Sequence, residues 1–241
     1  RFVKGLGFPD VPKREAFRFE LCIVDHLRRS QMRVDLHIHS NYSDSSRSPK
    51  EIVSIARDRN VGLISVCDHG TTAAYEKLLN ACRKVGIRCV LGIELSAMWK
   101  SEDLHMLAYN FNEDDAGMKS LIVRQYQDIE CEYIVYNMSL DYPHMSLEDY
   151  RMFEYPREKG GWKYLHYAVA KGAAATYEEA NAFIYGKYSS PNHLSSIGSC
   201  SMRDFCSTVK QANGVSVLAH PGYLYERYGP DGFIKCLADL K

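Results

Sequence analysis

The first part of the chain alternates short apolar runs with amphipathic segments. Four runs have the length and composition of buried strands: residues 34–38, 63–67, 89–91 and 104–109. After the first run, the sequence from Ser48 to Glu51 is a capping box that begins a helix extending to about Arg59. A second helix is expected over 72–85, and Gly86 should close it in the left-handed conformation. This strand–helix–strand order predicts a parallel sheet or barrel.

The pattern changes at about residue 112. Apolar residues between Met118 and Tyr133 recur at helical spacing, and helix-capping pairs begin at Ser146, Thr176 and Ser201. Eleven of the seventeen tyrosines lie between residues 126 and 188. We expect a helical insertion that either packs against the barrel mouth or forms a lid with substrate contacts. A strand is expected again at 215–218, with a last helix near Asp231.

These patterns predict four regions in one α/β protein. Residues 1–31 form an N-terminal segment with an amphipathic helix, and 32–111 form the first part of a barrel. Residues 112–213 are the helical insertion, and 214–241 return to the barrel. A chain of 241 residues can bury a sizeable core, so one domain with an insertion fits as well as two domains.

Composition narrows the functional classes. Hydrophobic residues make up 46% of the chain, and 30 basic residues balance 30 acidic ones, so no global charge attracts nucleic acid or a membrane. An anionic ligand must be attracted locally. The eight cysteines form no CxxC pair and are expected to be reduced, no apolar run approaches the ~20 residues of a membrane span, and no signal peptide is recognisable. We therefore expect a cytoplasmic protein with no obligatory protein partner.

The most distinctive chemistry lies on the first predicted strand. His37 and His39 are two residues apart, so both imidazoles project from the same face. Neutral imidazole is a good ligand for Zn, Mn or Fe. Asp44 adds a carboxylate on the loop that leaves the same strand end. Two neighbouring histidines on a strand are common without metal, so this pair is only a first indication.

Four other predicted strand ends carry similar residues. Asp68 and His69 follow the second strand, Glu94 comes just after the third, His105 lies beside the fourth, and His220 ends the strand at 215–218. Individually, a solvated carboxylate, a core histidine or a turn residue explains each one equally well. Together they place ligand-type residues at the rim where barrel enzymes have their active sites. The joint pattern predicts a metal site with more than one ion.

The motifs that carry these residues resemble the polymerase and histidinol phosphatase (PHP) domain family. They occur in the family's order: DLHIHSNYSD at 35–44, CDHG at 67–70, GIELSA at 92–97, HMLAY at 105–109 and LAHPG at 218–222. The resemblance implies a distorted (β/α)7 barrel with two to three divalent ions (Mn, Zn or Fe) at the C-terminal ends of its strands. The long insertion is most similar to the branch of stand-alone nucleotide phosphoesterases.

The resemblance also implies ligand assignments. It gives His37 and His39 to a first metal with Glu94 as the bridge to a second, which His105 and His220 complete. It gives Asp44 and His69 to a third metal, and it makes Asp68 a residue that orients a ligand.

Two departures from the family concern the end of the chain and the insertion. Members usually finish with a Gly-Ser-Asp-x-His-type motif, whereas nothing after His220 supplies one before Lys241, so we expect a barrel without its last strands. Where the nucleotide branch has an Arg and a His near a helix start, this chain has Lys163 and His166, which we expect to bind substrate.

The expected activity is hydrolysis of a phosphate ester of a nucleotide or short oligonucleotide by metal-activated water. Asp68 or His69 would pass a proton to the leaving oxygen. One alternative is a phosphatase for a small metabolite of the histidinol phosphate type. The other is a non-catalytic PHP-fold module that binds a ligand or partner. Substrate profiling with phosphate release separates the first two readings, and a downstream Asp-x-His motif would count against the third.

Overall fold

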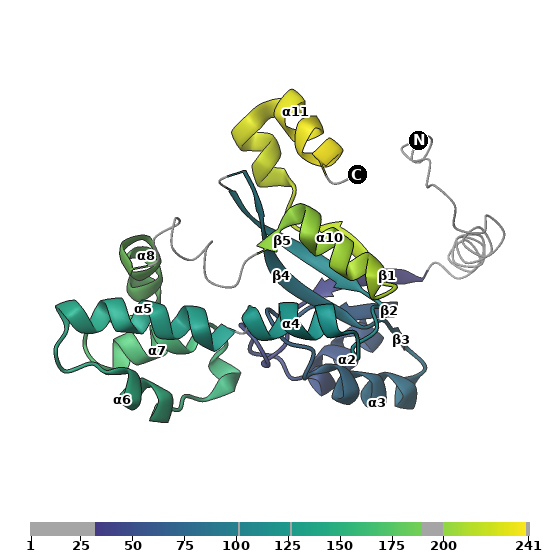
Figure 1. Ribbon diagram of the computed structural model, residues 1–241. Helices are drawn as coiled ribbons and strands as arrows, with labels where there is room; N and C mark the ends of the chain where they lie inside the picture. Colours follow the sequence, from purple (N-terminus) through teal and green to yellow (C-terminus); the bar gives the residue numbers. More distant parts are fainter. Residues whose placement is uncertain (1–31, 101, 126, 189–199, 240–241) are drawn as a thin grey trace.

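The computed structural model describes residues 32–100, 102–125, 127–188 and 200–239, so the helix expected within 1–31 lies outside the described part (Figure 1). A parallel sheet has the order β1 (Arg33–Ile38), β2 (Val61–Val66), β3 (Arg88–Cys89). A second sheet has the order β6 (Cys200–Ser201), β4 (Gly92–Trp99), β5 (Glu102–Tyr109), β7 (Val215–Leu218). An isolated bridge between His69 and Glu94 joins the end of β2 to the start of β4.

The second sheet differs from the expected parallel barrel. β5 runs antiparallel to both β4 and β7, and only residues 100 and 101 separate β4 from β5. Parallel neighbours need a crossover of a dozen or more residues, so this short connection permits only a hairpin. The α/β class is confirmed. The described strands form two open sheets, however, and the closed (β/α)7 barrel is not observed among them.

Two helices pack against the parallel sheet as the sequence predicts. α2 (Pro49–Asp58) begins with the capping box of Ser48 and Glu51, and α3 (Tyr75–Val85) ends at Gly86, whose φ is 74°. Their apolar faces form a core with β2 that includes Ile64 and Leu78. This core holds β1 and β2, which lead into the first two motifs, in a fixed register.

Side chains of β4 and β5 alternate strictly between the two faces of the second sheet. One face packs under α4 (Ala116–Arg124), α10 (Met202–Gln211) and α11 (Gly222–Asp239), and its buried side chains include Ile93, Leu95, Ala97, Leu104, Met106 and Ala108. The intervening positions, among them Glu94 and His105, therefore point to the opposite face. α11 begins well before the expected start at Asp231 and is kinked at Gly229.

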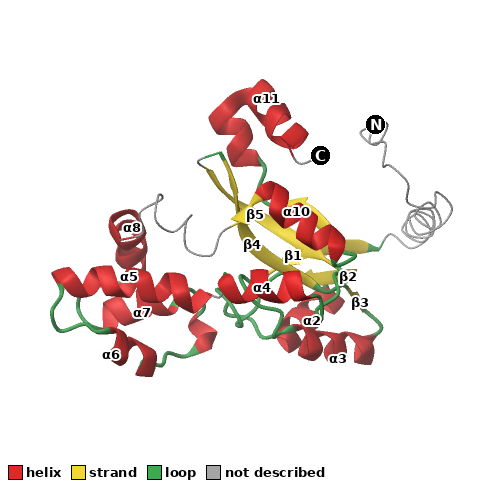
Figure 2. Ribbon diagram, in the orientation of Figure 1, coloured by secondary structure: helices red, strands yellow, loops and turns green. Residues whose placement is uncertain are grey.

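The remaining helices form a separate bundle with its own core. They are α5 (Gln127–Asp141), α6 (Leu147–Met152), the short 3-10 helix η1 (Arg157–Lys159), α7 (Lys163–Ala170) and α8 (Tyr177–Tyr188). Figures 1 and 2 show this bundle to one side of the sheets, beyond α4. Tyrosines contribute much of its interior, including Tyr150 and Tyr167. The caps predicted at Ser146, Thr176 and Ser201 are all present.

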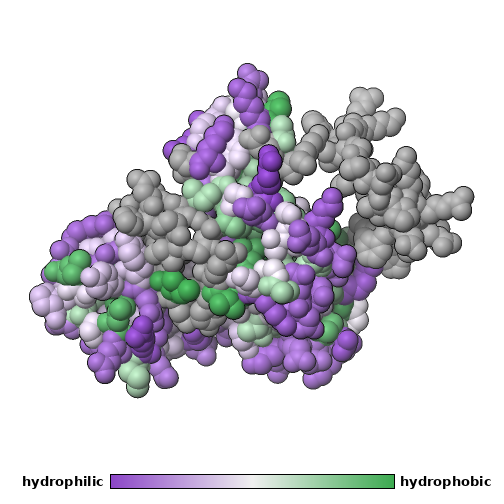
Figure 3. All heavy atoms as spheres, viewed as in Figure 1, coloured by the Kyte–Doolittle hydropathy of each residue, from purple (hydrophilic) through white to green (hydrophobic). Residues whose placement is uncertain are grey.

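Hydrophilic side chains dominate the surface over α3, at the lower right of Figure 3. No helix in the described ranges has both the length and the apolar character needed to cross a membrane.

Candidate metal centre

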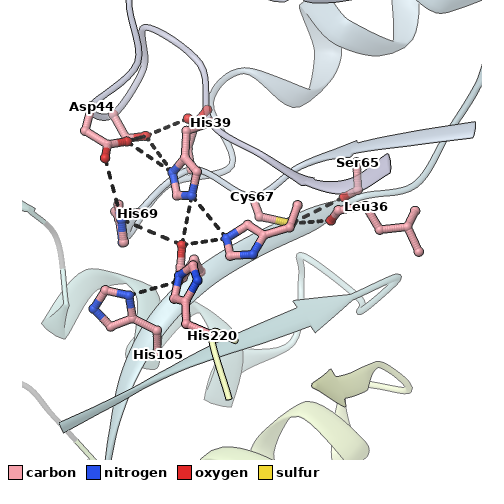
Figure 4. Close-up of polar contacts among 12 residues, drawn as sticks. Leu36, His39, Asp44, Ser65, Cys67, His69, His105 and His220 are labelled. Carbon is pink, nitrogen blue, oxygen red and sulfur yellow. Dashed lines mark hydrogen bonds and ion pairs between the residues drawn. The ribbon is translucent and has the colours of Figure 1, made fainter. Parts of the chain in front are cut away.

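A buried carboxylate lies at the middle of the site. Glu94, at the start of β4, has no exposed surface, and four imidazoles surround it (Figure 4). Its Oε1 lies 2.9 Å from His105 Nδ1 and 3.1 Å from His220 Nε2. Its Oε2 lies 2.9 Å from His37 Nε2 and 3.0 Å from His39 Nε2. Residues from β1, β4, β5 and the end of β7 thus meet at one point.

β1 presents its two histidines side by side, as the sequence predicts. The Nε2 atoms of His37 and His39 are 3.1 Å apart. Two contacts fix the backbone of β1. Tyr109 donates a hydrogen bond of 2.8 Å to the carbonyl of Leu36, and the Cys67 thiol lies 3.3 Å from the same oxygen. These contacts fix the backbone immediately before His37.

Asp44 and His69 form the opposite side of the centre. Asp44 Oδ1 lies 3.1 Å from His39 Nδ1, and its Oδ2 lies 3.9 Å from His69 Nε2. His69 Nε2 is also 3.6 Å from Glu94 Oε2. His39 therefore lies between the two carboxylates, with one ring nitrogen facing each.

Asp68 organises the loop that leads to Asp44. Its carboxylate is buried and accepts hydrogen bonds from the Ser40 N–H (2.6 Å), the Ser40 hydroxyl (2.6 Å) and the Ser43 hydroxyl (2.7 Å). Burial raises the pKa of Asp68, against the lowering effect of these donors. The side chain lines neither of the cavities described below, so its contacts favour a positioning role over the predicted proton transfer to substrate.

Two of the ligand-type residues do not lie at the C-terminal ends of strands. Glu94 is the third residue of β4, and His105 lies in the middle of β5, because the hairpin reverses the chain direction. His220 follows β7 as expected and has a φ of 45°. A non-glycine residue in this left-handed region costs roughly 1–2 kcal/mol. Such strain is typical of positions where function fixes the side chain.

The ionisation of the centre reflects strong coupling between acids and imidazoles. Burial alone would lower the pKa of His39, but hydrogen bonds to Asp44 and Glu94 raise it to about 10. Burial opposes ionisation of Asp44, yet its contact with His39 lowers the pKa of that carboxyl to about 2. The pKa of Glu94 is likewise lowered despite its burial, chiefly by hydrogen bonds from His105 and His37. Burial lowers the pKa of His69 to about 4.

The donor atoms fit divalent metal ions. Two groups, His37–Glu94–His220 and His39–His69–Glu94, each have ligand atoms within 4.8 Å of one another. Ligands bonded at about 2.1 Å in a tetrahedral site are about 3.4 Å apart, so small shifts would allow both groups to coordinate. Imidazole nitrogen with carboxylate oxygen suits Zn, Mn or Fe. Glu94 belongs to both groups. The structure therefore groups His37 with His220 and His39 with His69, whereas the resemblance implies His37 with His39 and His105 with His220.

Two cavities of about 370 Å³ each adjoin the centre, and His69 and Trp162 line both. The lining of the first also includes Tyr42, Tyr155, Arg157 and Lys163. The lining of the second also includes Ser96, Asp103, His105 and Gln125. Sequence reasoning missed Arg157, Trp162 and Asp103. Only Asp103 had a local signal, since it lies two residues before His105 on one face of a strand.

The insertion contacts the centre through a two-glycine turn. The Gly161 N–H donates to the carbonyl of Asp44 (2.6 Å), and the ring of Trp162 lies 5.5 Å from that of His69. His166 supports this turn: its Nε2 is 2.7 Å from the Gly160 carbonyl, and its ring stacks on that of Tyr155 at 4.3 Å.

The two predicted substrate residues therefore differ in placement. Lys163 lines the first cavity, with its Nζ 3.3 Å from the Arg151 carbonyl and over the ring of Tyr150. His166 lines neither cavity, and its contacts favour a role in shaping the turn over direct contact with substrate.

Comparison with known proteins identifies relatives with related chemistry. A family model described as PHP domain matches residues 35–195. A 5'-3' exoribonuclease of Haemophilus influenzae is 35% identical over 38% of this chain and 33% of its own length. The 5'-3' exoribonuclease Rnm of Salmonella typhimurium is 23% identical over 78% of this chain and 65% of its own. A 3',5'-nucleoside bisphosphate phosphatase of Chromobacterium violaceum is 29% identical over 36% and 32%.

Among solved structures, one from Bifidobacterium adolescentis that is designated a metal-dependent phosphoesterase matches with a TM-score of 0.68 and 25% identity. The match covers 86% of this chain and 74% of that one. The matched part of the chain thus spans between a third and two thirds of the length of these curated relatives.

Proposed function

The chain belongs to the PHP domain family, and from this we propose that it is a metal-dependent phosphoric ester hydrolase acting on a nucleotide or short oligonucleotide. One observation carries the proposal. Imidazoles and carboxylates from five separate segments converge on the buried Glu94, beside a cavity lined by cationic and aromatic side chains.

The donor groups suggest how ions would be held. His37, Glu94 and His220 would bind one ion, and His39, His69 and Glu94 would bind a second, with Asp44 beside the latter pair. Bound divalent ions would supply an acidified water and positive charge for phosphoryl oxygens. Asp68 would hold the loop before Asp44 in place, and Tyr109 would hold the strand before His37.

The first cavity has the chemistry to bind the rest of the substrate. Arg157 and Lys163 provide positive charge in a protein whose charges otherwise balance, and guanidinium groups match phosphate geometry well. Tyr42, Tyr155 and Trp162 offer aromatic surface for a base. A volume of about 370 Å³ lies within the range of small-ligand sites. The relatives named as exoribonucleases and as a nucleoside bisphosphate phosphatase support a nucleotide substrate.

We assign no general acid among the chain's residues. Asp68 is enclosed by Ser40 and Ser43, and His69 is better placed as a ligand because its Nε2 faces Asp44 and Glu94. A ring nitrogen that binds a metal has no proton to donate from the same atom.

Substrate profiling tests the proposal directly. Phosphate release would be measured from a nucleoside 3',5'-bisphosphate and histidinol phosphate, and release of phosphate or mononucleotide from a 5'-phosphorylated dinucleotide, with added Mn²⁺ and with chelator. We expect metal-dependent release, with kcat/KM for the nucleotides at least about tenfold above that for histidinol phosphate, a difference of about 1.4 kcal/mol. Preference for histidinol phosphate would redirect the assignment to a small metabolite. Equal rates with metal and chelator for all three substrates would refute it.

A further inference from the structure

A groove on the outer surface lies between α2 and α3, away from the metal centre. Its volume is about 410 Å³. Its lining residues on α2, from Lys50 to Arg57, recur at the i, i+3, i+4, i+7 spacing of one helical face. On α3, the lining residues Lys77 and Lys84 are likewise seven residues apart, on one face of the helix. The two helices therefore present matched faces to one groove.

The groove carries a local excess of positive charge. All four of its charged lining residues are basic and exposed, and no carboxylate lines it. Arg57 is the one of these four that contacts an acid, at 3.0 Å from Asp58, within the part of the chain that the structure describes. Because the whole chain is neutral, this cluster is a specific local feature that attracts anions.

The floor of the groove is apolar, with Val53, Ala81 and Val85 between the basic residues. Cations around an aliphatic floor suit a ligand with regularly spaced charges and less polar groups between them. The phosphodiester backbone of a nucleic acid, with its sugars and bases, has this character.

The groove adjoins the first cavity through one shared contact. Lys77 donates a hydrogen bond to the hydroxyl of Tyr42 and lies over the Tyr42 ring, and Tyr42 lines the first cavity. Arg157 and Lys163 also line that cavity. Basic residues are thus present both in the first cavity and in the groove, with Tyr42 between Lys77 and the cavity.

The length of this path indicates the size of the ligand. Lys50 and Arg57 are seven residues apart, as are Lys77 and Lys84, which at 1.5 Å per residue places each pair about 10.5 Å apart along its helix. A ligand that contacts both ends of either pair must span about 10.5 Å along the groove, in addition to the part that occupies the first cavity. We infer that the α2–α3 groove binds the backbone of a single-stranded oligonucleotide whose terminal phosphate ester occupies the metal centre. This inference rests on the proposed phosphoesterase function.

The test compares long and short substrates in Lys50→Gln/Lys84→Gln protein. The readout is the ratio of kcat/KM for a 12-nucleotide RNA to that for a 5'-phosphorylated dinucleotide. We expect the ratio to fall about tenfold. Binding of a labelled phosphorothioate 12-mer, which resists hydrolysis, should also weaken, and its log–log salt slope should shrink by about 1.4, as two lost phosphate contacts on a single strand imply.

The matched control is Arg203→Gln/Lys210→Gln on α10, which lies above the sheets in Figure 1 while α3 lies below them. These exposed residues give the same change in charge. An unchanged ratio and salt slope in the groove variant would overturn the inference, as would an equal effect in the control. Absence of hydrolysis of both substrates would instead refute the proposed function, and the binding measurement would still decide the role of the groove.

Discussion

The metal centre and the helical insertion are built in opposite ways. The centre takes its residues from strands and strand ends far apart in the sequence, and all of them depend on one buried side chain, Glu94. The bundle of α5 to α8, which lies within the expected insertion, is one continuous segment with its own tyrosine-rich core. Neither group of candidate ligands includes a described residue of the insertion.

This difference separates chemistry from selectivity. The insertion contributes Trp162, Arg157 and Lys163 to the first cavity and contacts the centre mainly through the Gly160–Gly161 turn. Changes in the insertion should therefore alter substrate binding while metal content is preserved. Changes at the centre should instead lower the metal content.

The largest effect is expected from Glu94→Gln. Both candidate groups lose their shared carboxylate, so metal content should fall in both and kcat/KM should drop at least about 10⁴-fold, roughly 5.5 kcal/mol. Metal content is measured by mass spectrometry and kcat/KM by phosphate release. Glu102→Gln is the matched control. This carboxylate at the start of β5 is also buried, but it contacts Tyr228 and Arg227. Full metal loading in Glu94→Gln would contradict the shared-ligand arrangement.

The next largest effect is expected on the pH dependence of the free energy of unfolding in chelator-treated protein. The pKa of His39 is raised from 6.5 to about 10. Its contribution to stability is therefore complete below pH 6.5 and is lost as pH rises toward 10, which amounts to at most about 4–5 kcal/mol. Denaturant unfolding between pH 6.5 and 10 measures the loss.

The variant His39→Gln should flatten this alkaline dependence, whereas His144→Gln, in the insertion, should retain it. His144 contacts only a backbone carbonyl, that of Lys171, among its described hydrogen bonds. Metal-loaded protein should lose less stability over the same range, because an ion takes the place of the proton. The same alkaline slope in wild type and His39→Gln would show that other groups control it.

A smaller effect is expected where the two regions meet. Gly160 has a φ of 67°, and a Cβ there would lie 2.9 Å from the backbone nitrogen of Ser46. Gly172 has a φ of 74° but open space around it, so Gly172→Ala carries only the backbone cost of roughly 1–2 kcal/mol. Gly160→Ala should cost about 1–3 kcal/mol more, because the turn must shift. It should also raise KM, whereas Gly172→Ala should not.

Thermal unfolding and KM are compared between Gly160→Ala and Gly172→Ala, because only the former changes the contact between the turn and Ser46. Equal losses of stability with unchanged KM in both would show that the turn does not couple the insertion to the loop that carries Asp44.

The smallest effect is expected for single cations of the insertion. Arg157→Ala or Lys163→Ala should each raise KM about tenfold, since a charge-assisted contact to phosphate is worth about 1.5–3 kcal/mol. Metal content and kcat should change little. Lys159→Ala is the control, because this exposed residue of η1 lines neither cavity. KM is measured by steady-state kinetics with the best nucleotide substrate. An equal increase in KM for Lys159→Ala would contradict the prediction.

Sequence reasoning succeeded where the signal was local. The capping box at Ser48, the left-handed Gly86 and the paired orientation of His37 and His39 depend on neighbouring residues only, and all three appear as expected. The β4–β5 hairpin was missed, although residues 100 and 101 are too few for a crossover. The sequence pattern predicts a strand at 89–91 with Glu94 just after it, whereas Glu94 lies within β4.

The sequence by itself determined which residue types could form the centre and near which strands they lie, because strand periodicity and helix caps act over a few residues. Only the tertiary structure decided that β5 pairs with β7, that Glu94 lies between His37, His39, His105 and His220, and that Trp162 packs against His69. Those relations join residues up to 126 positions apart. Strand pairing and the packing of the insertion set them, and no local pattern in the chain encodes either.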